Sequence, residues 1–244
     1  MAQAYRFALD LTPAQERAFR SHAGAARKAY NAMLALVKAT MGQRQAERSY
    51  GIAEADLTPA LNWSLAGLRK EWNRRKDDVA PWWAENSKEA YNTGLDALAR
   101  GLDAWDKSRK GQRAGAAVGF PRFKSARSRR SVRFTTGTIR VEAGRHHIIL
   151  PRVGRIRTHE STRKLARRTE ARTARILSAT LSEDTAGRWF CSFQVIVRRA
   201  AAAPAHVGAG APAVGVDAGV KADSLLVIAA PDGREIGRSR PRSP

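Results

Sequence analysis

The spacing of apolar residues along the chain changes near residue 112. Before that point, two sets of apolar residues repeat at intervals of three and four residues, as one face of a helix does. After it, short runs such as SVRF and WFCSFQVIV are rich in β-branched and aromatic residues, which is typical of strands. The chain is therefore predicted to be an α+β protein, with the helical residues forming core more readily than binding surface. The two helical sets are Leu61, Leu65, Leu68 and Trp72, and Tyr91, Leu95, Leu98, Leu102 and Trp105.

Three helix starts are predicted from capping residues. In the first, a threonine precedes a proline and is followed three residues later by a glutamine, which is a capping box. We expect that helix to run to about residue 40, and a short strand at 4–11 to precede it. The three predicted starts are Thr12 with Pro13 and Gln15, Thr58 with Pro59, and Asn86 with Glu89.

The second half of the chain reads as strands with one interruption. Several strands at close spacing between 131 and 197 suggest a small barrel or sheet. The stretch STRKLARRTEARTAR, residues 161–175, is expected to form a basic helix or loop within it. Residues 200–212 are a low-complexity stretch of Ala, Pro, Gly and Val with one His, which predicts a linker.

The charge of the chain indicates its partner. It carries 44 Lys and Arg against 22 Asp and Glu, and residues 121–175 alone hold 17 basic and 3 acidic residues. Such density on a β-rich module favours nucleic acid over an anionic membrane surface, with salt-dependent contacts to phosphate and sugar. The alternation around Arg133 predicts one basic and one apolar strand face. The predicted nucleic-acid-binding residues are Arg122, Lys124, Arg127, Arg129, Arg130, Arg133, Arg152, Arg155 and Lys221.

Other side chains of this region are expected to be structural. Phe120 and Phe123 could stack on bases, but packing under their loop is favoured. Cys191 is expected in the core, and His146 and His147 in a strand. One cysteine allows no intramolecular disulfide and no multi-cysteine zinc site within these residues. No run of about 20 apolar residues and no signal peptide is recognised, so a cytoplasmic location fits.

The stretch AVGVDAGVKADSLLVIAAPDG, residues 213–233, raises a question of chemistry. A strand ending at Asp217, a turn at Gly219 and a second apolar run place a carboxylate where it could bind Mg²⁺. A nuclease needs several such carboxylates around its metal ions. The pattern also fits the phosphate-contacting turn of an actin-like ATPase, or a structural hairpin capped by Asp217. From these residues alone the three alternatives stay open.

The segments, taken in order, resemble the TnpB (OrfB) proteins of bacterial insertion sequences, which are relatives of type V CRISPR nucleases. YRFALDLTPAQERAFRSHAGAARKAYNAML matches the opening strand and helix of that family, and GFPRFKSARSRRSVRF is similar to a family signature. VGVDAGVK resembles the first acidic motif of the RuvC nuclease domain. The resemblance implies an RNA-guided DNA endonuclease that uses Mg²⁺, with Asp217 as catalytic residue and metal ligand. Its implied partners are a guide RNA and a double-stranded DNA target, without a membrane or small-molecule partner, in the bacterial cytoplasm near the nucleoid.

The same resemblance implies a layout and a limit. A helical recognition lobe would be inserted in a small β-barrel (wedge) module, and the first strands of an RNase H-like (RuvC) fold would follow. In the family a later Glu, a later Asp and a four-cysteine zinc ribbon come after the region covered here, so this chain is expected to bind nucleic acid without cutting it alone. A stand-alone RNA- or DNA-binding regulator is the alternative. The predicted divisions are 1–11 (first wedge strand), 12–112 (helical lobe, helix-turn-helix-like), 113–199 (basic wedge module), 200–212 (linker) and 213–244 (RuvC-type segment, truncated).

Overall fold

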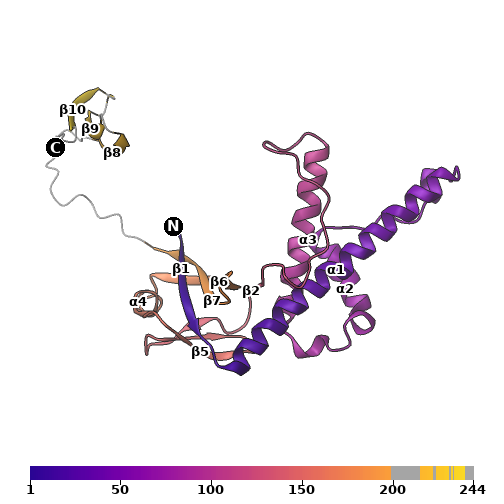
Figure 1. The fold of residues 1–244 in the computed structure, drawn as a ribbon, viewed down its shortest axis with the longest axis horizontal. Coiled ribbons are helices and arrows are strands. Elements are labelled where there is room, and N and C mark those ends of the chain that lie inside the picture. The colour runs from indigo at the N-terminus through magenta and orange to yellow at the C-terminus, as the bar shows by residue number, and fades with distance from the viewer. Residues whose placement is uncertain (199–214, 222–223, 231, 233, 240–244) are drawn as a thin grey trace. The chain divides into compact units, whose positions relative to one another are not determined.

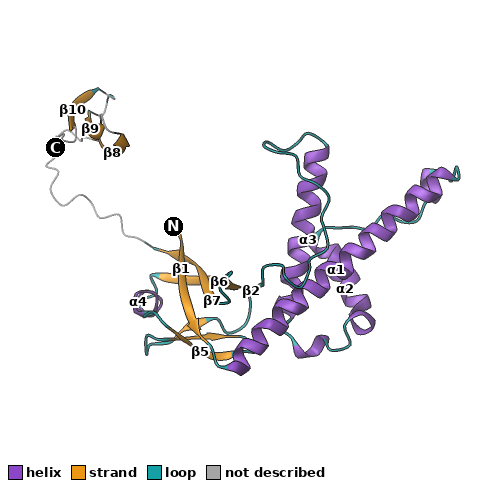
Figure 2. Ribbon diagram, in the orientation of Figure 1, coloured by secondary structure: helices purple, strands orange, loops and turns teal. Residues whose placement is uncertain are grey.

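The computed structural model describes residues 1–198, 215–221, 224–230, 232 and 234–239 (Figure 1). The chain divides into two compact units, 1–199 and 200–244. The first unit combines helices with a sheet, as Figure 2 shows, so the predicted α+β class is confirmed. Its elements are β1 (Ala2–Asp10), α1 (Pro13–Ser49), α2 (Leu65–Val79), α3 (Lys88–Arg109), β2 (Ser131–Phe134), β3 (Arg140–Val141), β4 (His147–Leu150), β5 (Gly154–Thr158), α4 (Arg163–Glu170), β6 (Ala174–Glu183) and β7 (Trp189–Val197), with 3-10 turns η1 (Glu54–Asp56) and η2 (Trp83–Glu85).

Helix α1 begins where its capping residues predict. The Gln15 backbone N–H donates to the Thr12 hydroxyl at 3.3 Å, and the Thr12 N–H donates to the Gln15 side-chain oxygen at 3.1 Å. The helix is longer than predicted, because it continues past residue 40 to Ser49. Its last turns are held by polar contacts rather than by an apolar stripe: Arg44 and Arg48 both pair with Glu54, at 2.6 and 2.9 Å.

The predicted start of the second helix at Thr58 is wrong. The Thr58 backbone N–H and hydroxyl both donate to the Glu47 carboxylate, at 2.8 and 2.5 Å. This contact ties the loop to α1, so Thr58 does not cap a helix. Helix α2 instead begins at Leu65, where the Ser64 hydroxyl accepts from the Gly67 N–H at 3.2 Å.

Helix α3 begins one residue later than predicted. Ser87 is its N-cap, and its hydroxyl accepts from the Glu89 N–H at 3.3 Å. Asn86, the predicted cap, lies just outside the helix, where its side-chain oxygen accepts from the Ser21 hydroxyl of α1 at 3.0 Å. Most of the predicted apolar stripes pack in the core, with Trp72 of α2 stacked on Tyr91 of α3 at 4.9 Å between ring centroids. Two predicted members differ: Leu61 lies before α2, and Trp105 is only partly buried.

Helices α1 and α3 approach each other closely at Gly94. A methyl group added to this glycine would lie 2.0 Å from the backbone oxygen of Ala26. No side chain fits in that space, so the distance between the two helices depends on glycine here.

The strands form one antiparallel sheet in the order β2-β6-β7-β1-β5-β4-β3. The first strand of the chain lies inside it, because Ala2–Ala8 pair with Phe190–Ile196 of β7 and Leu9 pairs with Thr158 of β5. Among the described strands β2 and β3 stand at the two ends of this order, so the hydrogen bonding does not close a barrel. Strand β2 alternates as predicted, with Val132 and Phe134 buried and Arg133 exposed.

The described part of the second unit is a small antiparallel sheet. Its strands are β8 (Gly215–Lys221), β9 (Ser224–Ala229) and β10 (Glu235–Ser239), in the order β10-β9-β8. The predicted succession of strands is therefore present, but β8 does not end at Asp217. It continues through Gly219 to Lys221, with a register shift in its pairing with β9 between Ala218 and Lys221, so the turn predicted at Gly219 is wrong.

A buried carboxylate joins α3 to the sheet. Glu89, 5% exposed, accepts from the Thr135 backbone N–H at 3.0 Å and from the Thr135 and Thr136 hydroxyls at 2.7 and 3.0 Å. Burial on its own raises the pKa of this carboxyl, but the hydrogen bonds from Thr135 and Thr136 bring the pKa below its usual value. Glu89 is thus held charged at the first turn of α3, where negative charge is favourable.

We expect Glu89→Gln to lower the free energy of unfolding by about 1–3 kcal/mol, since bonds to a charged acceptor are replaced by weaker ones. Glu85→Gln is the matched control, because Glu85 is exposed on the turn before α3. Urea unfolding at neutral pH measures both. Equal stability of the two variants would show that the Glu89 contacts contribute nothing.

A buried histidine joins α1 to the start of α3. The His22 Nδ1 lies 2.8 Å from the Ala18 carbonyl oxygen, and the Ser87 backbone N–H donates to His22 Nε2 at 3.2 Å. Accepting at Nε2 requires the neutral ring with its proton on Nδ1. Burial, opposed by the hydrogen bond to Ala18 and assisted by the charge of Arg152, lowers the pKa of His22.

This contact should make stability depend on pH. Because the folded-state pKa is lower than the unfolded value of about 6.5, the contribution of His22 is complete above that value and is lost as the pH falls through the folded-state pKa. We expect the thermal midpoint to fall more between pH 7.5 and pH 5 in the unmodified chain than in His22→Gln. Differential scanning calorimetry at both pH values measures this, and identical falls would contradict it.

Candidate nucleic-acid interface

A groove of about 660 Å³ runs across the basic end of the sheet in the first unit. One side is the loop before β2, with Arg127, Arg129 and Arg130, and the other is the turn between β6 and β7 at Glu183. Arg6 of β1 also lines it. Three of the predicted nucleic-acid-binding residues therefore meet here, in what we call the β-module groove.

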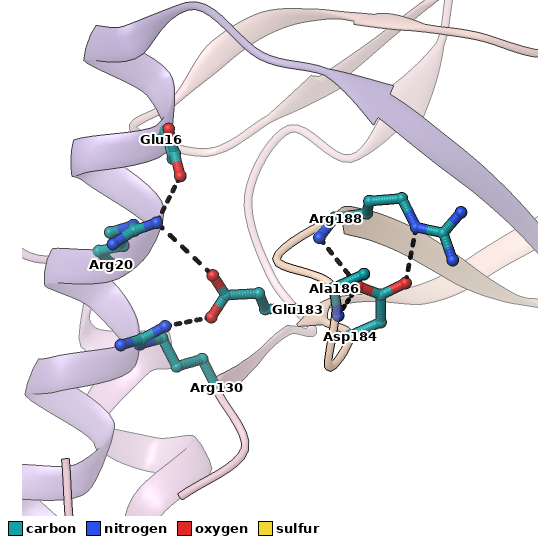
Figure 3. A network of polar contacts seen from close by, with 7 residues as sticks. All are labelled: Glu16, Arg20, Arg130, Glu183, Asp184, Ala186 and Arg188. Atoms are coloured by element: carbon teal, nitrogen blue, oxygen red, sulfur yellow. Dashed lines mark hydrogen bonds and ion pairs between the residues drawn. The ribbon is translucent and has the colours of Figure 1, made fainter. Parts of the chain in front are cut away.

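Glu183 fixes the loop beside this groove (Figure 3). Its buried carboxylate forms an ion pair with Arg130 and lies 3.7 Å from a guanidinium nitrogen of Arg20 on α1, while its backbone N–H donates to the Arg130 carbonyl at 3.1 Å. Arg20 also pairs with Glu16 at 2.7 Å. The charge of Arg130 is therefore compensated by Glu183, and its predicted contact with phosphate stays a prediction.

The turn on the other side of the groove is rigidly shaped by Asp184. Its carboxylate accepts from the backbone N–H groups of Ala186 and Arg188, both at 2.9 Å, and from Arg188 Nε at 2.9 Å (Figure 3). The Arg188 backbone hydrogen bond is the main reason that the pKa of Asp184 lies below its usual range. The Arg6 and Arg188 guanidiniums lie 3.9 and 5.8 Å from the centroid of the Phe190 ring, so one aromatic ring positions both cations.

Three of the predicted residues remain available for a polyanion. Arg122, Arg127 and Arg129 are exposed, and none of the ion pairs within the described residues involves them. An unpaired exposed guanidinium can neutralise a phosphate without breaking an internal contact.

Lys124 makes several contacts with α1, and its predicted contact with nucleic acid stays a prediction. Its backbone N–H donates to the Asn31 side-chain oxygen, and the Asn31 amide donates to the Lys124 carbonyl, both at 2.9 Å. The Lys124 ammonium lies 4.2 Å from the centroid of the Tyr30 ring. Burial, with a smaller effect from the charge of Arg100, lowers the pKa of Lys124. These contacts fasten the loop to α1.

The other predicted arginines of the first unit are spread apart and hold internal partners. Arg133 donates to the Gln194 side chain at 3.0 Å, and Arg152 donates to the Ala84 carbonyl at 3.2 Å. Arg155 pairs with Glu142 at 2.8 Å. All three are exposed, yet the structure does not bring them together with the β-module groove as one site.

A second basic surface follows α4. Leu165 and Ala166 are buried beneath the helix, while its cations other than Arg168, and those of the chain just after it, are exposed. Arg198 joins this set, because its backbone N–H donates to the Thr173 carbonyl at 2.8 Å. Within the described residues no carboxylate forms an ion pair with any of them. This surface, the α4 ridge, consists of Arg163, Lys164, Arg167, Arg172, Arg175 and Arg198.

The residues of the α4 ridge were not among the predicted binding residues, although their segment was predicted as a basic helix or loop. The signal that identifies them is the sequence RKLARR, in which two apolar residues sit between pairs of cations. In a helix of this length that pattern buries the apolar pair and exposes basic side chains on the other side. Arg168 is the exception, since it donates to Gln3 at 2.8 Å and to the Tyr5 hydroxyl.

The aromatic residues near the basic loop behave differently from one another. Phe120 is partly buried and meets Trp105 edge-on at 4.8 Å between centroids, which agrees with packing. Phe123 is 52% exposed, so the expectation that it packs under the loop is wrong. Cys191 is buried as predicted.

The candidate metal ligand lies in the second unit. The backbone of Asp217 belongs to β8 and pairs with Val227 of β9, and Lys221 pairs with Ser224. The side chains of Asp217 and Lys221 lie outside the described residues, so their predicted roles stay predictions. Among the described residues there is no group of three or more His, Cys, Asp or Glu that could hold a metal ion. None of the described helices combines the length and apolar character needed to cross a membrane.

Residues 1–46 match a family model of the OrfB/IS605 type described as "Helix-turn-helix domain". In the structure these residues form strand β1 and most of the single continuous helix α1. The pair of helices that places a recognition helix in the DNA major groove is therefore not contained in the matched segment. In this structure the matched segment joins the helices to the sheet, because it contains both β1 and most of α1.

Two relatives, each named "Putative RNA-guided DNA endonuclease", come from Mycobacterium tuberculosis strains CDC 1551 / Oshkosh and ATCC 25618 / H37Rv. Each is 39% identical to the chain over 229 residues, which is 90% of this chain and 47% of the relative. The chain thus spans about half the length of the curated relatives it matches. Together with the OrfB-type segment, this identity makes the chain a TnpB/OrfB-type protein.

Proposed function

We propose that residues 1–199 are the nucleic-acid-binding part of an RNA-guided DNA endonuclease. The observation that carries this proposal is the α4 ridge, whose six exposed cations have no carboxylate partners among the described residues. Four of them lie on α4 and the turn after it, Arg175 lies at the start of β6, and Arg198 follows β7. Arg122, Arg127 and Arg129 at the β-module groove supply a second set. Cations without internal partners release counterions when a phosphate backbone replaces them, which makes binding favourable and strongly salt-dependent.

This charge distribution suggests which molecule would read the DNA sequence. Phosphate contacts fix position and carry no sequence information, so the sequence of the DNA target would be read by pairing with a guide RNA. The sheet of the first unit would serve as the wedge-type module, and α1 to α3 as the recognition lobe. Strands β8 to β10 would begin the RuvC-type nuclease segment. The names of the relatives support a guide RNA and a DNA target as partners.

We propose one Mg²⁺ ligand in this chain, Asp217. Asp217 on β8 would be a metal ligand, and a metal bound there would stabilise charge on the attacking and leaving oxygens of a phosphodiester. One carboxylate does not make such a site, and the described residues contain no group of three or more His, Cys, Asp or Glu that could hold a metal ion. We therefore expect the 244-residue polypeptide to bind nucleic acid without cutting it by itself.

The test uses the purified 244-residue chain with labelled RNA transcribed from DNA adjoining its gene, and with duplex DNA complementary to part of that RNA. We expect salt-sensitive binding of the RNA, RNA-dependent retention of the duplex, and intact DNA in the presence of Mg²⁺. Mg²⁺-dependent cleavage that disappears in Asp217→Ala would contradict the inactivity. RNA binding without any RNA-dependent retention of DNA would favour a stand-alone RNA-binding regulator.

A further inference from the structure

The helical part holds a second groove, of about 760 Å³, away from the β-module groove. It lies between the far half of α1, the loop before α2 and the end of α3. Trp63, Trp105 and Phe120 line it, and each is only partly buried. We call it the aromatic groove.

The rings in this groove meet edge to face rather than in parallel. Trp63 and Trp105 have centroids 6.2 Å apart at 74°, and Trp105 and Phe120 are 4.8 Å apart at 84°. Neither pair is stacked, in contrast to Trp72 and Tyr91 in the core, whose rings are inclined by 27°. In each of these pairs the edge of one ring covers a face of the other, and the Arg109 guanidinium lies 5.0 Å from the centroid of the Trp105 ring. These contacts cover only part of the flat surface of the three rings, because no two of the rings are stacked face to face.

Cations surround these rings. Lys38, Arg44, Arg48 and Arg109 line the groove, and its lining includes no acidic side chain. Glu54 pairs with Arg44 and Arg48, and Asp106 with Arg109, so part of this charge is compensated. Lys38 has no carboxylate partner among the described residues, and its ammonium lies 6.0 Å from the Phe120 ring and 4.9 Å from the exposed ring of Phe123.

We propose that the aromatic groove binds an unstacked base of a single-stranded nucleic acid, with Lys38 beside the adjoining phosphate. A nucleotide strand offers a flat apolar face and a negative charge in every unit, which matches partly open rings bordered by cations. An apolar protein segment would use the rings but not the charge. Every base has a face that can stack, so this contact tolerates any sequence. The proposal rests on the proposed function, because it requires a chain that binds nucleic acid.

The experiment compares a single-stranded RNA with a strand of equal length that carries phosphates and sugars but lacks several bases. Fluorescence anisotropy measures the affinity for both at several salt concentrations. We expect the unmodified chain to bind the complete strand about 5- to 150-fold more tightly for each stacked base. Trp105→Leu and Trp63→Leu should lose most of this preference while keeping the affinity for the base-free strand and the salt dependence.

The control is Trp82→Leu, because Trp82 is 39% exposed and lies outside the aromatic groove. The thermal midpoint of each variant shows whether it is still folded. Lys38→Gln changes an exposed residue, and this substitution should weaken the binding of both strands by a similar factor. If the unmodified chain binds both strands equally and with a steep salt dependence, the aromatic groove does not bind a base, whereas the proposed function still holds. A chain that binds neither strand would overturn both.

Discussion

Replacement of Arg163, Lys164 and Arg167 by glutamine is expected to weaken RNA and DNA binding and to flatten its salt dependence. Each lost phosphate contact lowers the slope of log affinity against log salt by about 0.7–0.9, so three contacts should lower it by about 2 to 3. The loss should be similar for unrelated sequences, because these side chains contact the backbone rather than base edges. Binding titrations between roughly 50 and 200 mM salt measure it.

The matched control removes the same number of charges elsewhere. Arg74, Arg100 and Lys107 lie on α2 and α3 and pair with carboxylates three or four residues away, at 3.1, 2.6 and 2.9 Å. Their replacement by glutamine changes the net charge equally but removes cations that are already compensated. If both triple variants flatten the slope to the same extent, binding depends on total charge and the α4 ridge has no special part.

Gly94→Ala is expected to destabilise the first unit strongly. The added methyl group would lie 2.0 Å from the Ala26 oxygen, which is backbone and cannot rotate away, so α1 and α3 must move apart. Overpacking of this kind lowers the free energy of unfolding by about 1–3 kcal/mol. We expect a value at the upper end of this range, because the neighbouring atom belongs to the backbone. For a unit of this size that corresponds to a fall in the thermal midpoint of about 5–10 °C.

The same helix offers the opposite case. A methyl group added to Gly101 would lie 3.4 Å from the nearest atom, Pro121 Cγ, which is ordinary contact at the end of a side chain. Gly101→Ala should therefore keep or raise the midpoint, since alanine is favoured over glycine within a helix by about 0.5–1 kcal/mol. Differential scanning fluorimetry on both variants tests the pair. Equal midpoints for Gly94→Ala and the unmodified chain would show that the close approach of α1 and α3 is not essential.

Local patterns in the sequence were sufficient for much of the fold. The capping box at Thr12 and the apolar stripe through Leu95 and Leu98 depend on neighbours within one or two turns, and both are present as predicted. The wrong start at Thr58 has a different cause. The Thr58 hydroxyl donates a hydrogen bond to Glu47, which lies 11 residues away. The residues next to Thr58 in the sequence do not reveal this partner.

The candidate nucleic-acid interface likewise has one feature that the sequence predicts and another that depends on distant partners. Counting charges along the chain located the basic module, because composition is a property of the sequence. Whether a given arginine is free depends on distant partners: Arg130 meets Glu183 across 53 residues, whereas Arg127 and Arg129, close beside it, have no ion-pair partner among the described residues. Charge density alone therefore does not separate Arg130 and Arg155, which have carboxylate partners, from Arg163 and Arg167, which have none among the described residues.

Hydrogen–deuterium exchange of the 244-residue chain, with and without saturating RNA, tests the central claim most directly. We expect slower exchange on binding in residues 163–175 and in the loop 122–130, because these segments carry exposed cations without carboxylate partners among the described residues. Slower exchange that spares both segments, under conditions in which the RNA is fully bound, would contradict it.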